Sequence, residues 1–382
     1  MLKKKVLITG AKGFIGKHLT LRLEESNLFS VRAFNKCDEV DVLQSNMQDV
    51  DFVIHLAGIN RTDNPMEFGE GNVNLTQTLC DFIRASGRAI PVLFASSIQA
   101  SLNHEYGKSK QQAEQIFFEL QRETGNPIHI FSLPNVFGKW AKPFYNSVVA
   151  TFCHQISRSL PIDVHDANKQ LELLYIDDLV QQFVHILTDS SAPTGFIDVK
   201  RTYATTLGEL AEALYSFKAN RAICKVGQVG VGFERALYAT YLSYLEPSAW
   251  MTQLDTKKDD RGTFVELLKT MDAGQFSYCT VKPGQSRGGH YHHTKNERFV
   301  VIKGSIIFRS IHIVTQECHE IVVSDQNIQV IETIPGWAHE LENTSTEEAI
   351  VFIWANECFD VSHPDTITYT GINKLQDSLM EK

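Results

Sequence analysis

Short apolar runs alternate with helical stripes over the first part of the chain. Four runs predict buried strands: 5–9, 30–34, 51–58 and 91–95. The stripe formed by Ile15, Leu19 and Leu23 predicts a helix packed on a sheet directly after the first strand. Strands that alternate with helices predict an α/β, doubly wound, mainly parallel sheet, whose ligand lies beyond the carboxyl ends of the strands.

The pattern changes in the second half of the chain. From Leu254 onward apolar and polar residues alternate and helical stripes largely stop, which is typical of strands. The tyrosine- and leucine-rich segment 238–247 indicates a packed connection. A chain of 382 residues is too long for one ordinary domain. We therefore expect an α/β domain over 1–245 and an all-β domain over 246–382.

Composition excludes several classes of protein. The net charge of −9, without a basic stripe, argues against a nucleic-acid surface. The apolar run after the N-terminal lysines is too short for a signal peptide, and no stretch is long enough to cross a bilayer. The seven cysteines are scattered and form no C-x-x-C motif, so they are expected to be reduced thiols of a cytoplasmic protein.

A glycine-rich loop joins the first strand to its helix. Gly10, Gly13 and Gly16 form G-x-x-G-x-x-G, in which glycines let the backbone approach a pyrophosphate while the helix N-terminus supplies free N–H groups. The second strand is followed by Asn35, at a position where an acidic residue would bind the ribose 2′-hydroxyl of NAD. Instead Lys12, Arg32 and Lys36 are expected close to this site, which favours NADP(H), although Asp38 leaves NAD open.

A tyrosine and a lysine one helical turn apart follow the fourth strand. Tyr106 and Lys110 fall on the inward face of the predicted helix. We expect the ammonium to lower the pKa of the phenol, which suits it to give a proton to a carbonyl while hydride arrives.

A second group of polar residues lies between Gly284 and Gly304. On a strand His290 and His292 point to one face and His293 to the other, with Glu297 five residues beyond His292. Two imidazoles and a carboxylate form part of a divalent-metal site, and His339 is the expected fourth ligand.

The first half resembles the extended short-chain dehydrogenase/reductase family through T-G-x-x-G-x-x-G, H-L-A-G, Ser-Ser and Y-x3-K. The resemblance implies Tyr106 and Lys110 as the catalytic pair, and Ser97, or less favoured Ser96, as the group that orients the substrate carbonyl. It implies that the segment 133–138 lies beside the nicotinamide, and that the substrate lobe is reduced. The implied cofactor-binding residues are Gly10, Lys12, Gly13, Phe14, Ile15, Gly16, Asn35, Lys36, Leu56, Ala57, Gly58, Tyr106 and Lys110.

The second half resembles the cupin family of small β-barrels. The motifs G-x5-H-x-H-x4-E-x6-G and P-G-x2-H-x3-N are both present and imply a metal held by His290, His292, Glu297 and His339. The segments 259–264 and 287–291 also resemble the metal-independent 3,5-epimerases of rhamnose biosynthesis. In those cupins the histidine that matches His290 abstracts a proton, so whether His290 holds a metal or acts as a base stays open.

Together, the two halves resemble the bifunctional nucleotide-sugar enzymes of capsule and O-antigen synthesis of the CapF type. The resemblance implies a homodimer with a zinc-bearing cupin, acting on a UDP-linked 2-acetamido-2,6-dideoxy-4-hexulose. The cupin would epimerise C3, and the reductase would then pass hydride from NADPH to C4. The product would be the UDP-6-deoxy-L-talosamine derivative, on the route to UDP-N-acetyl-L-fucosamine.

Several alternatives stay open. The ketone could be polarised by the metal or by Arg287, and the base could be Tyr291, His293 or Glu342. The cupin could instead be a structural, dimerising, metal-binding domain of a single-activity NADPH-dependent 4-keto-sugar reductase. A redox or metabolite sensor would not need the tyrosine–lysine pair, and a metal-storage protein or scaffold would not need the cofactor loop.

Overall fold

The computed structural model describes residues 3–372 and divides into two compact units. One unit comprises Met1–Tyr215 and Arg235–Glu246, and the other comprises Ser216–Glu234 and Pro247–Lys382. Helices α8 (Leu207–Ala222) and α9 (Gly232–Leu242) therefore each contribute to both units. That residues 1–245 and 246–382 fold as separate domains stays a prediction.

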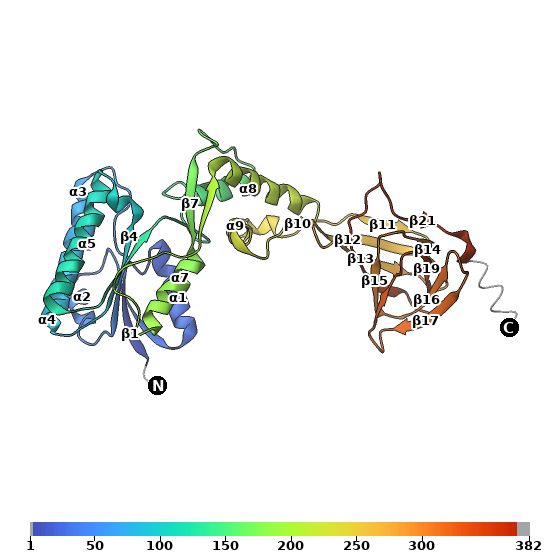
Figure 1. The fold of residues 1–382 in the computed structure, drawn as a ribbon, viewed down its shortest axis with the longest axis horizontal. Coiled ribbons are helices and arrows are strands. Elements are labelled where there is room, and N and C mark those ends of the chain that lie inside the picture. Colours follow the sequence, from blue (N-terminus) through green and yellow to red (C-terminus); the bar gives the residue numbers. More distant parts are fainter. Residues whose placement is uncertain (1–2, 373–382) are drawn as a thin grey trace. The chain divides into compact units, whose positions relative to one another are not determined.

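The first unit contains the predicted parallel sheet, in the order β2-β1-β3-β4-β5-β8 (Figure 1). The order changes direction between β1 and β3, so the carboxyl ends of these two strands form the crevice where a doubly wound sheet binds its ligand. The strands are β1 (Lys4–Thr9), β2 (Phe29–Phe34), β3 (Phe52–His55), β4 (Val92–Ser97), β5 (Ile128–Leu133) and β8 (Gly195–Ile197).

Helices cover both faces of this sheet (Figure 1). On one face, Leu19 and Leu23 of α1 and Phe183 of α7 pack on β1 and β5. On the other, apolar residues of α2, α4 and α5 pack on the same strands. The helices and turns are α1 (Phe14–Ser26), α2 (Val40–Asn46), α3 (Met66–Phe68), η1 (Gly69–Asn74), α4 (Leu75–Ser86), η2 (Ile98–Ser101), α5 (Glu105–Thr124) and α7 (Ile176–Thr188).

A small lobe follows the fifth strand. Its three-stranded sheet has the order β6-β7-β9, with helix α6 inserted between β6 and β7. The lobe consists of β6 (Asn135–Phe137), α6 (Val148–Ser157), β7 (Gln170–Tyr175), β9 (Thr202–Thr206) and the first part of α8.

The second unit is built from two mainly antiparallel sheets. One has the order β10-β12-β13-β20-β15-β18, with β11 paired to β12, and the other has the order β17-β16-β19-β14-β21. The core lies between the sheets, where Cys279, Val301 and Val351 of the first meet Phe308 and Leu341 of the second. The elements are β10 (Lys225–Val226), η3 (Pro247–Ala249), β11 (Thr256–Asp259), β12 (Gly262–Thr270), β13 (Gln275–Val281), β14 (Ser286–Tyr291), β15 (Glu297–Lys303), β16 (Ser305–His312), β17 (Cys318–Ser324), β18 (Val330–Glu332), β19 (Trp337–Asn343), β20 (Ala349–Ala355), β21 (Ile367–Thr368) and η4 (Thr370–Ile372).

A β-bulge in β14 decides which side chains of that strand face the core. Arg287 pairs with Leu341, but His290, not Gly289, pairs with His339, so one extra residue enters β14. Gly288 makes this possible because its φ is +115° and a Cβ there would lie 2.5 Å from the His339 carbonyl oxygen. Without the bulge, Gly289 and Tyr291 would face the core in place of the histidines.

No helix of the described residues is long and apolar enough to span a membrane.

The bulge can be tested with two alanine substitutions. Gly284 also has a positive φ, of +70°, but a Cβ there would meet nothing, so Gly284→Ala carries only conformational strain of about 1 kcal/mol. Gly288→Ala adds a collision with backbone and is expected to cost about 3 kcal/mol. Thermal unfolding of the two variants should therefore differ clearly, and equal midpoints would contradict the role of Gly288.

Candidate functional site

The glycine-rich loop meets the loop after β3 at the carboxyl edge of the sheet. Gly10 has a φ of +73°, and a Cβ there would lie 2.8 Å from the Ala57 nitrogen, so any larger residue would separate the two loops. The Gly10 N–H donates to the Phe34 carbonyl at the end of β2 (2.7 Å), and the Ala57 N–H donates to Thr9 Oγ1 (3.2 Å). The structure thus brings the ends of β1, β2 and β3 together.

The predicted cofactor residues line this junction. Gly13 caps α1, and Phe14 and Ile15 begin it; the cap makes no side-chain hydrogen bond and the first turn holds no acidic residue. The N–H groups of that turn can therefore hold an anion. Of the other predicted residues, Gly16 lies in the first turn of α1, and the loops after β1 and β3 contain Gly10, Lys12, Leu56, Ala57 and Gly58.

The loop after β2 is built around Asn35. Its side-chain oxygen accepts from the Lys12 N–H (2.8 Å), and its own N–H donates to Asp38 Oδ2 (2.7 Å). The Asp38 carboxylate is therefore used within the turn. Arg32 pairs with Asp49 (2.5 Å), whereas Lys12 and Lys36 are exposed.

Helix α5 carries the tyrosine and lysine on its buried side. Tyr106 is hydrogen-bonded to Ser97 at the end of β4. Lys110 is buried, donates to the Ala95 carbonyl (2.9 Å), and lies with its Nζ 4.7 Å from the centre of the Phe94 ring. Ser96 instead donates to Glu114, so of the two predicted serines only Ser97 contacts the tyrosine.

The acidity of this pair differs from the expectation. Burial raises the pKa of Tyr106, and the effect that opposes it is the hydrogen bond from Ser97, not the charge of Lys110. Burial lowers the pKa of Lys110 to about 8, with Glu114 acting in the opposite direction. The prediction that the ammonium lowers the phenol pKa is therefore wrong for this structure, because the ammonium is directed to Ala95.

Asn72 is a buried polar residue that the sequence analysis missed. Its side chain accepts from the Ile59 N–H (2.7 Å) and donates to the Ile59 carbonyl (3.0 Å) and to Ser109 Oγ (2.9 Å). Gly58 lies against Asn72 Oδ1 and close to Lys110 Nζ. Asn72 thus ties the loop after β3 to the helix that carries Tyr106. An amide among the inward positions before α4 was the signal that could have revealed it.

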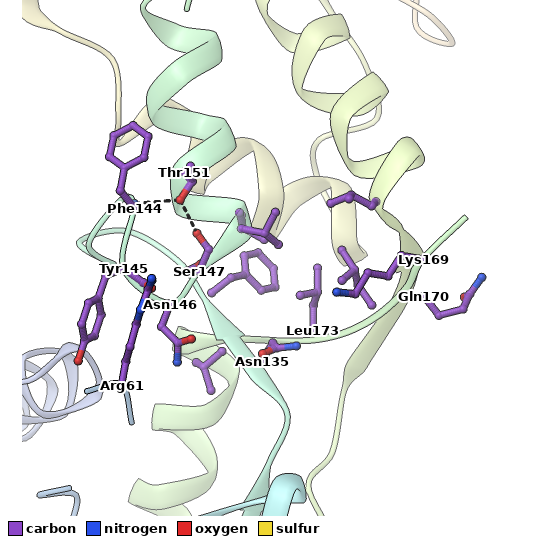
Figure 2. Close-up of a pocket in the computed structure, with 16 residues that line it drawn as sticks. Arg61, Asn135, Phe144, Tyr145, Asn146, Ser147, Thr151, Lys169, Gln170 and Leu173 are labelled. Carbon is purple, nitrogen blue, oxygen red and sulfur yellow. Dashed lines mark hydrogen bonds between the residues drawn. The ribbon is translucent and has the colours of Figure 1, made fainter. Parts of the chain in front are cut away.

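A cavity of about 570 Å³ lies between the small lobe and the loop after β3 (Figure 2). Arg61 donates to the Tyr145 carbonyl across it, and Thr151 Oγ1 accepts from the Phe144 N–H (3.0 Å). Among the described residues, its lining includes cations and amides but no carboxylate: Arg61, Asn135, Val136, Phe137, Phe144, Tyr145, Asn146, Ser147, Val148, Val149, Thr151, Lys169, Gln170, Leu171, Leu173 and Leu207. Such a lining suits an anionic ligand.

In the second unit, the four predicted metal ligands form one cluster. One ligand atom from each of His290, His292, Glu297 and His339 lies within 4.8 Å of the others. Nε2 of His292 and Nε2 of His339 lie 3.4 and 3.5 Å from Glu297 Oε2 and make no hydrogen bond with any residue in 3–372. Buried imidazole nitrogens without partners are costly, and three nitrogens with one carboxylate oxygen are a fitting donor set for zinc. The residues present therefore fit a metal ion.

Neighbouring groups fix the orientation of this cluster. Nδ1 of His292 is hydrogen-bonded to the Asp365 carbonyl, which leaves Nε2 with its lone pair toward Glu297. Lys295 pairs with Glu297 Oε1 (3.1 Å). The pKa of Glu297 lies well below its usual value despite burial, because His292, His339 and Lys295 surround it. Burial lowers the pKa of His290 to about 4. At neutral pH the cluster presents a neutral imidazole at His290 and an ionised carboxylate.

The residues predicted to polarise the ketone or to act as the base do not lie together at the metal-ligand cluster. Arg287 donates to the Thr280 carbonyl (2.9 Å) and pairs with Asp259 (3.2 Å). Tyr291 packs with the apolar group around Ile311 on the outer face of its sheet. Glu342 pairs with Arg309, and its position in β19 alternates with those of His339 and Leu341. His293 is exposed.

Comparison with protein families identifies both halves of the chain. Residues 6–197 match the NAD dependent epimerase/dehydratase family, and residues 257–367 match the polysaccharide biosynthesis C-terminal domain. The chain is 46% identical to the UDP-2-acetamido-2,6-β-L-arabino-hexul-4-ose reductase of Pseudomonas aeruginosa, over 95% of this chain and 97% of that protein.

Solved structures agree over the same length. The capsular polysaccharide assembling protein CapF of Staphylococcus aureus is 39% identical and superposes with a TM-score of 0.88, covering 95% of this chain and 99% of that one. The UDP-glucose 4-epimerase of Thermus thermophilus, in complex with NAD, is 17% identical with a TM-score of 0.53 and shares the fold of the first unit. It covers 63% of this chain and 98% of its own.

These matches confirm the resemblance to the CapF type that the motifs indicated. The chain, in which an epimerase/dehydratase domain precedes a polysaccharide biosynthesis C-terminal domain, belongs to the family that includes the Pseudomonas nucleotide-sugar reductase and CapF.

Proposed function

We propose that the enzyme epimerises C3 and then reduces C4 of a UDP-linked 2-acetamido-2,6-dideoxy-4-hexulose. The product is the UDP-6-deoxy-L-talosamine derivative, on the route to UDP-N-acetyl-L-fucosamine. The observation that carries the proposal is the presence of two separate polar sites in one chain: Tyr106 with Ser97 beside a dinucleotide loop, and a histidine–carboxylate cluster in the other unit. The similarity to a reductase of a related keto sugar supports the choice of substrate.

In the reductase unit, Tyr106 gives a proton to the C4 oxygen while hydride arrives from the nicotinamide. Ser97 orients the ketone, and Lys110 contacts the cofactor from its buried position behind Gly58. The carboxylate-free cavity with Arg61 and Lys169 suits the pyrophosphate of the sugar nucleotide. Lys12 and Lys36 are free to bind a 2′-phosphate, which favours NADPH over NADH.

The second unit is proposed to be a zinc-bearing cupin barrel. His290, His292, Glu297 and His339 would hold the ion, which as a Lewis acid makes the carbon next to a bound ketone more acidic. Because Arg287 is engaged by Asp259 and Thr280, polarisation of the ketone is assigned to the metal centre. The same geometry favours His290 as a ligand over His290 as a base.

The enzyme is proposed to act as a homodimer. The outer face of the β13–β20 pair carries the exposed side chains of Phe276 and Phe352 with Trp354 beside them, an apolar surface suited to a second copy.

A second candidate is a single-activity 4-keto-sugar reductase whose metal cluster only stabilises the barrel and its dimer. Two observations favour it: the name of the Pseudomonas relative mentions reduction alone, and the cluster is buried among core residues such as Phe299 and Phe308.

Replacing the proton donor should separate the two activities. Tyr106→Phe removes the group that protonates the C4 oxygen, so NADPH oxidation with the keto sugar should fall at least about 100-fold. Deuterium uptake at C3 in heavy water without NADPH should stay within about twofold of the native rate. The exposed Tyr215→Phe serves as control, and loss of both activities together in Tyr106→Phe would argue against two sites.

The choice of cofactor can be tested at Lys36. The native enzyme should bind NADPH about tenfold more tightly than NADH. One exposed lysine paired with the 2′-phosphate can account for a difference in affinity of this size. Lys36→Ala should raise the Kd for NADPH and leave that for NADH unchanged, measured by cofactor fluorescence. Tighter binding of NADH by the native enzyme would contradict the assignment.

Removal of one ligand should remove the metal. His339→Gln should reduce bound zinc from about one per chain to near none and abolish deuterium uptake at C3. Metal analysis and proton NMR of the sugar provide the readouts, with the exposed His185→Gln as control. Full zinc loss with unchanged deuterium uptake would contradict the role of the metal in acidifying C3, whereas absence of uptake in the native enzyme would favour the single-activity reductase.

A further inference from the structure

Four polar residues form one straight row across the inner face of a sheet in the second unit. His290 of β14 is paired with His339 of β19, His339 with Ser310 of β16, and Ser310 with His319 of β17. Residues directly opposite each other in neighbouring strands point to the same face. The row therefore begins with two predicted metal ligands and ends with a third histidine beyond a serine.

The row borders a cavity of about 640 Å³ between the two sheets, here named the inter-sheet cavity. His339 and His319 both line it, with the small side chain of Ser310 between them. Two strand spacings separate the histidine backbones by about 10 Å. Because serine fills little of that gap, a six-membered ring can lie over Ser310, with one side toward the metal cluster and the other toward His319.

His319 is a titratable residue of the inter-sheet cavity, and its one acidic partner within the described part of the chain is Glu317, two residues before it. Among the described residues that line the cavity, Glu332 is paired with Arg298 (2.5 Å) and His339 belongs to the metal cluster. Nε2 of His319 lies 3.1 Å from Glu317 Oε1, and its ring packs at 5.4 Å from that of Trp337. Glu317 thus accepts the Nε2 proton and leaves the lone pair on Nδ1, which is the arrangement of a general base.

We propose that His319 is the base that removes the C3 proton of the keto sugar, an inference that rests on the proposed epimerase function. The C–H bond breaks as Nδ1 takes the proton, and its electron pair forms the C3–C4 double bond of the enolate. A proton from solvent then adds to C3 from the opposite face, and the imidazolium returns its proton to solvent. Atoms and charge balance without an oxidant or reductant. Tyr291 and Glu342, on the outer face of the same sheet, take no part.

The test compares His319→Gln with the matched control His363→Gln. His363 is also exposed and paired with an acid, Asp360 (3.7 Å), but it does not line the inter-sheet cavity. In heavy water without NADPH, His319→Gln should take up deuterium at C3 at least about 100-fold more slowly than the native enzyme. His363→Gln should exchange at the native rate, and both variants should keep native zinc content and thermal midpoint.

The possible outcomes distinguish a failure of the role assigned to His319 from a failure of the proposed epimerase function. If the native enzyme takes up no deuterium, the epimerase proposal itself fails and the role of His319 falls with it. If the native enzyme exchanges and His319→Gln exchanges within about threefold of it, with zinc retained, the assignment of His319 is overturned while the epimerase function stands.

A second readout does not depend on turnover. Diethyl pyrocarbonate modifies exposed imidazoles, and mass spectrometry of peptides reports each histidine separately. The keto sugar should slow the modification of His319 at least about tenfold, because the bound sugar occupies the inter-sheet cavity. This protection is expected in both metal-loaded and metal-stripped protein. Modification of His363 should not change. Equal modification of His319 with and without the sugar would contradict the proposal.

Discussion

Removing a charge from water is costly, and each unit contains a buried charge at the place where its chemistry is proposed. In the first unit Lys110 is buried with a carbonyl and an aromatic ring as neighbours, and burial lowers its pKa to about 8. In the second unit Glu297 is buried among two imidazoles and Lys295, and its pKa stays well below the usual value. The opposite outcomes follow from the neighbours: the lysine lacks a strong counter-charge, whereas the carboxylate lies beside the Lys295 ammonium and two imidazoles.

These neighbours explain how each charge can serve a bound group. The Lys110 ammonium lies next to Gly58, at the junction that the cofactor loops form, so a bound dinucleotide would provide polar partners that the protein alone does not. Nε2 of His292 and Nε2 of His339 lack hydrogen bonds within the described part of the chain, and a metal ion would satisfy them. Both sites are therefore arranged around interactions that the bound group completes.

Much of the fold and many of the candidate residues were predictable from sequence because they depend on local patterns. The glycine loop and the Y-x3-K spacing each concern residues on one turn or helix, and the H-x-H-x4-E spacing concerns two strands consecutive in the chain with the short loop between them. What was not predictable depends on strand register. The row from His339 through Ser310 to His319 joins three strands, and no local pattern indicates which residues of those strands lie opposite each other. The direction of Lys110 toward Ala95, and the burial that raises the pKa of Tyr106, likewise depend on the packing of α5 on β4.

The central claim is that one ketone is used twice, first to acidify its neighbouring carbon and then as a hydride acceptor. The most direct test is the complete reaction in heavy water with unlabelled NADPH, followed by NMR of the product. The account predicts deuterium at C3, from solvent, and protium at C4, from the nicotinamide. A reduced product that carries protium at both carbons would contradict it.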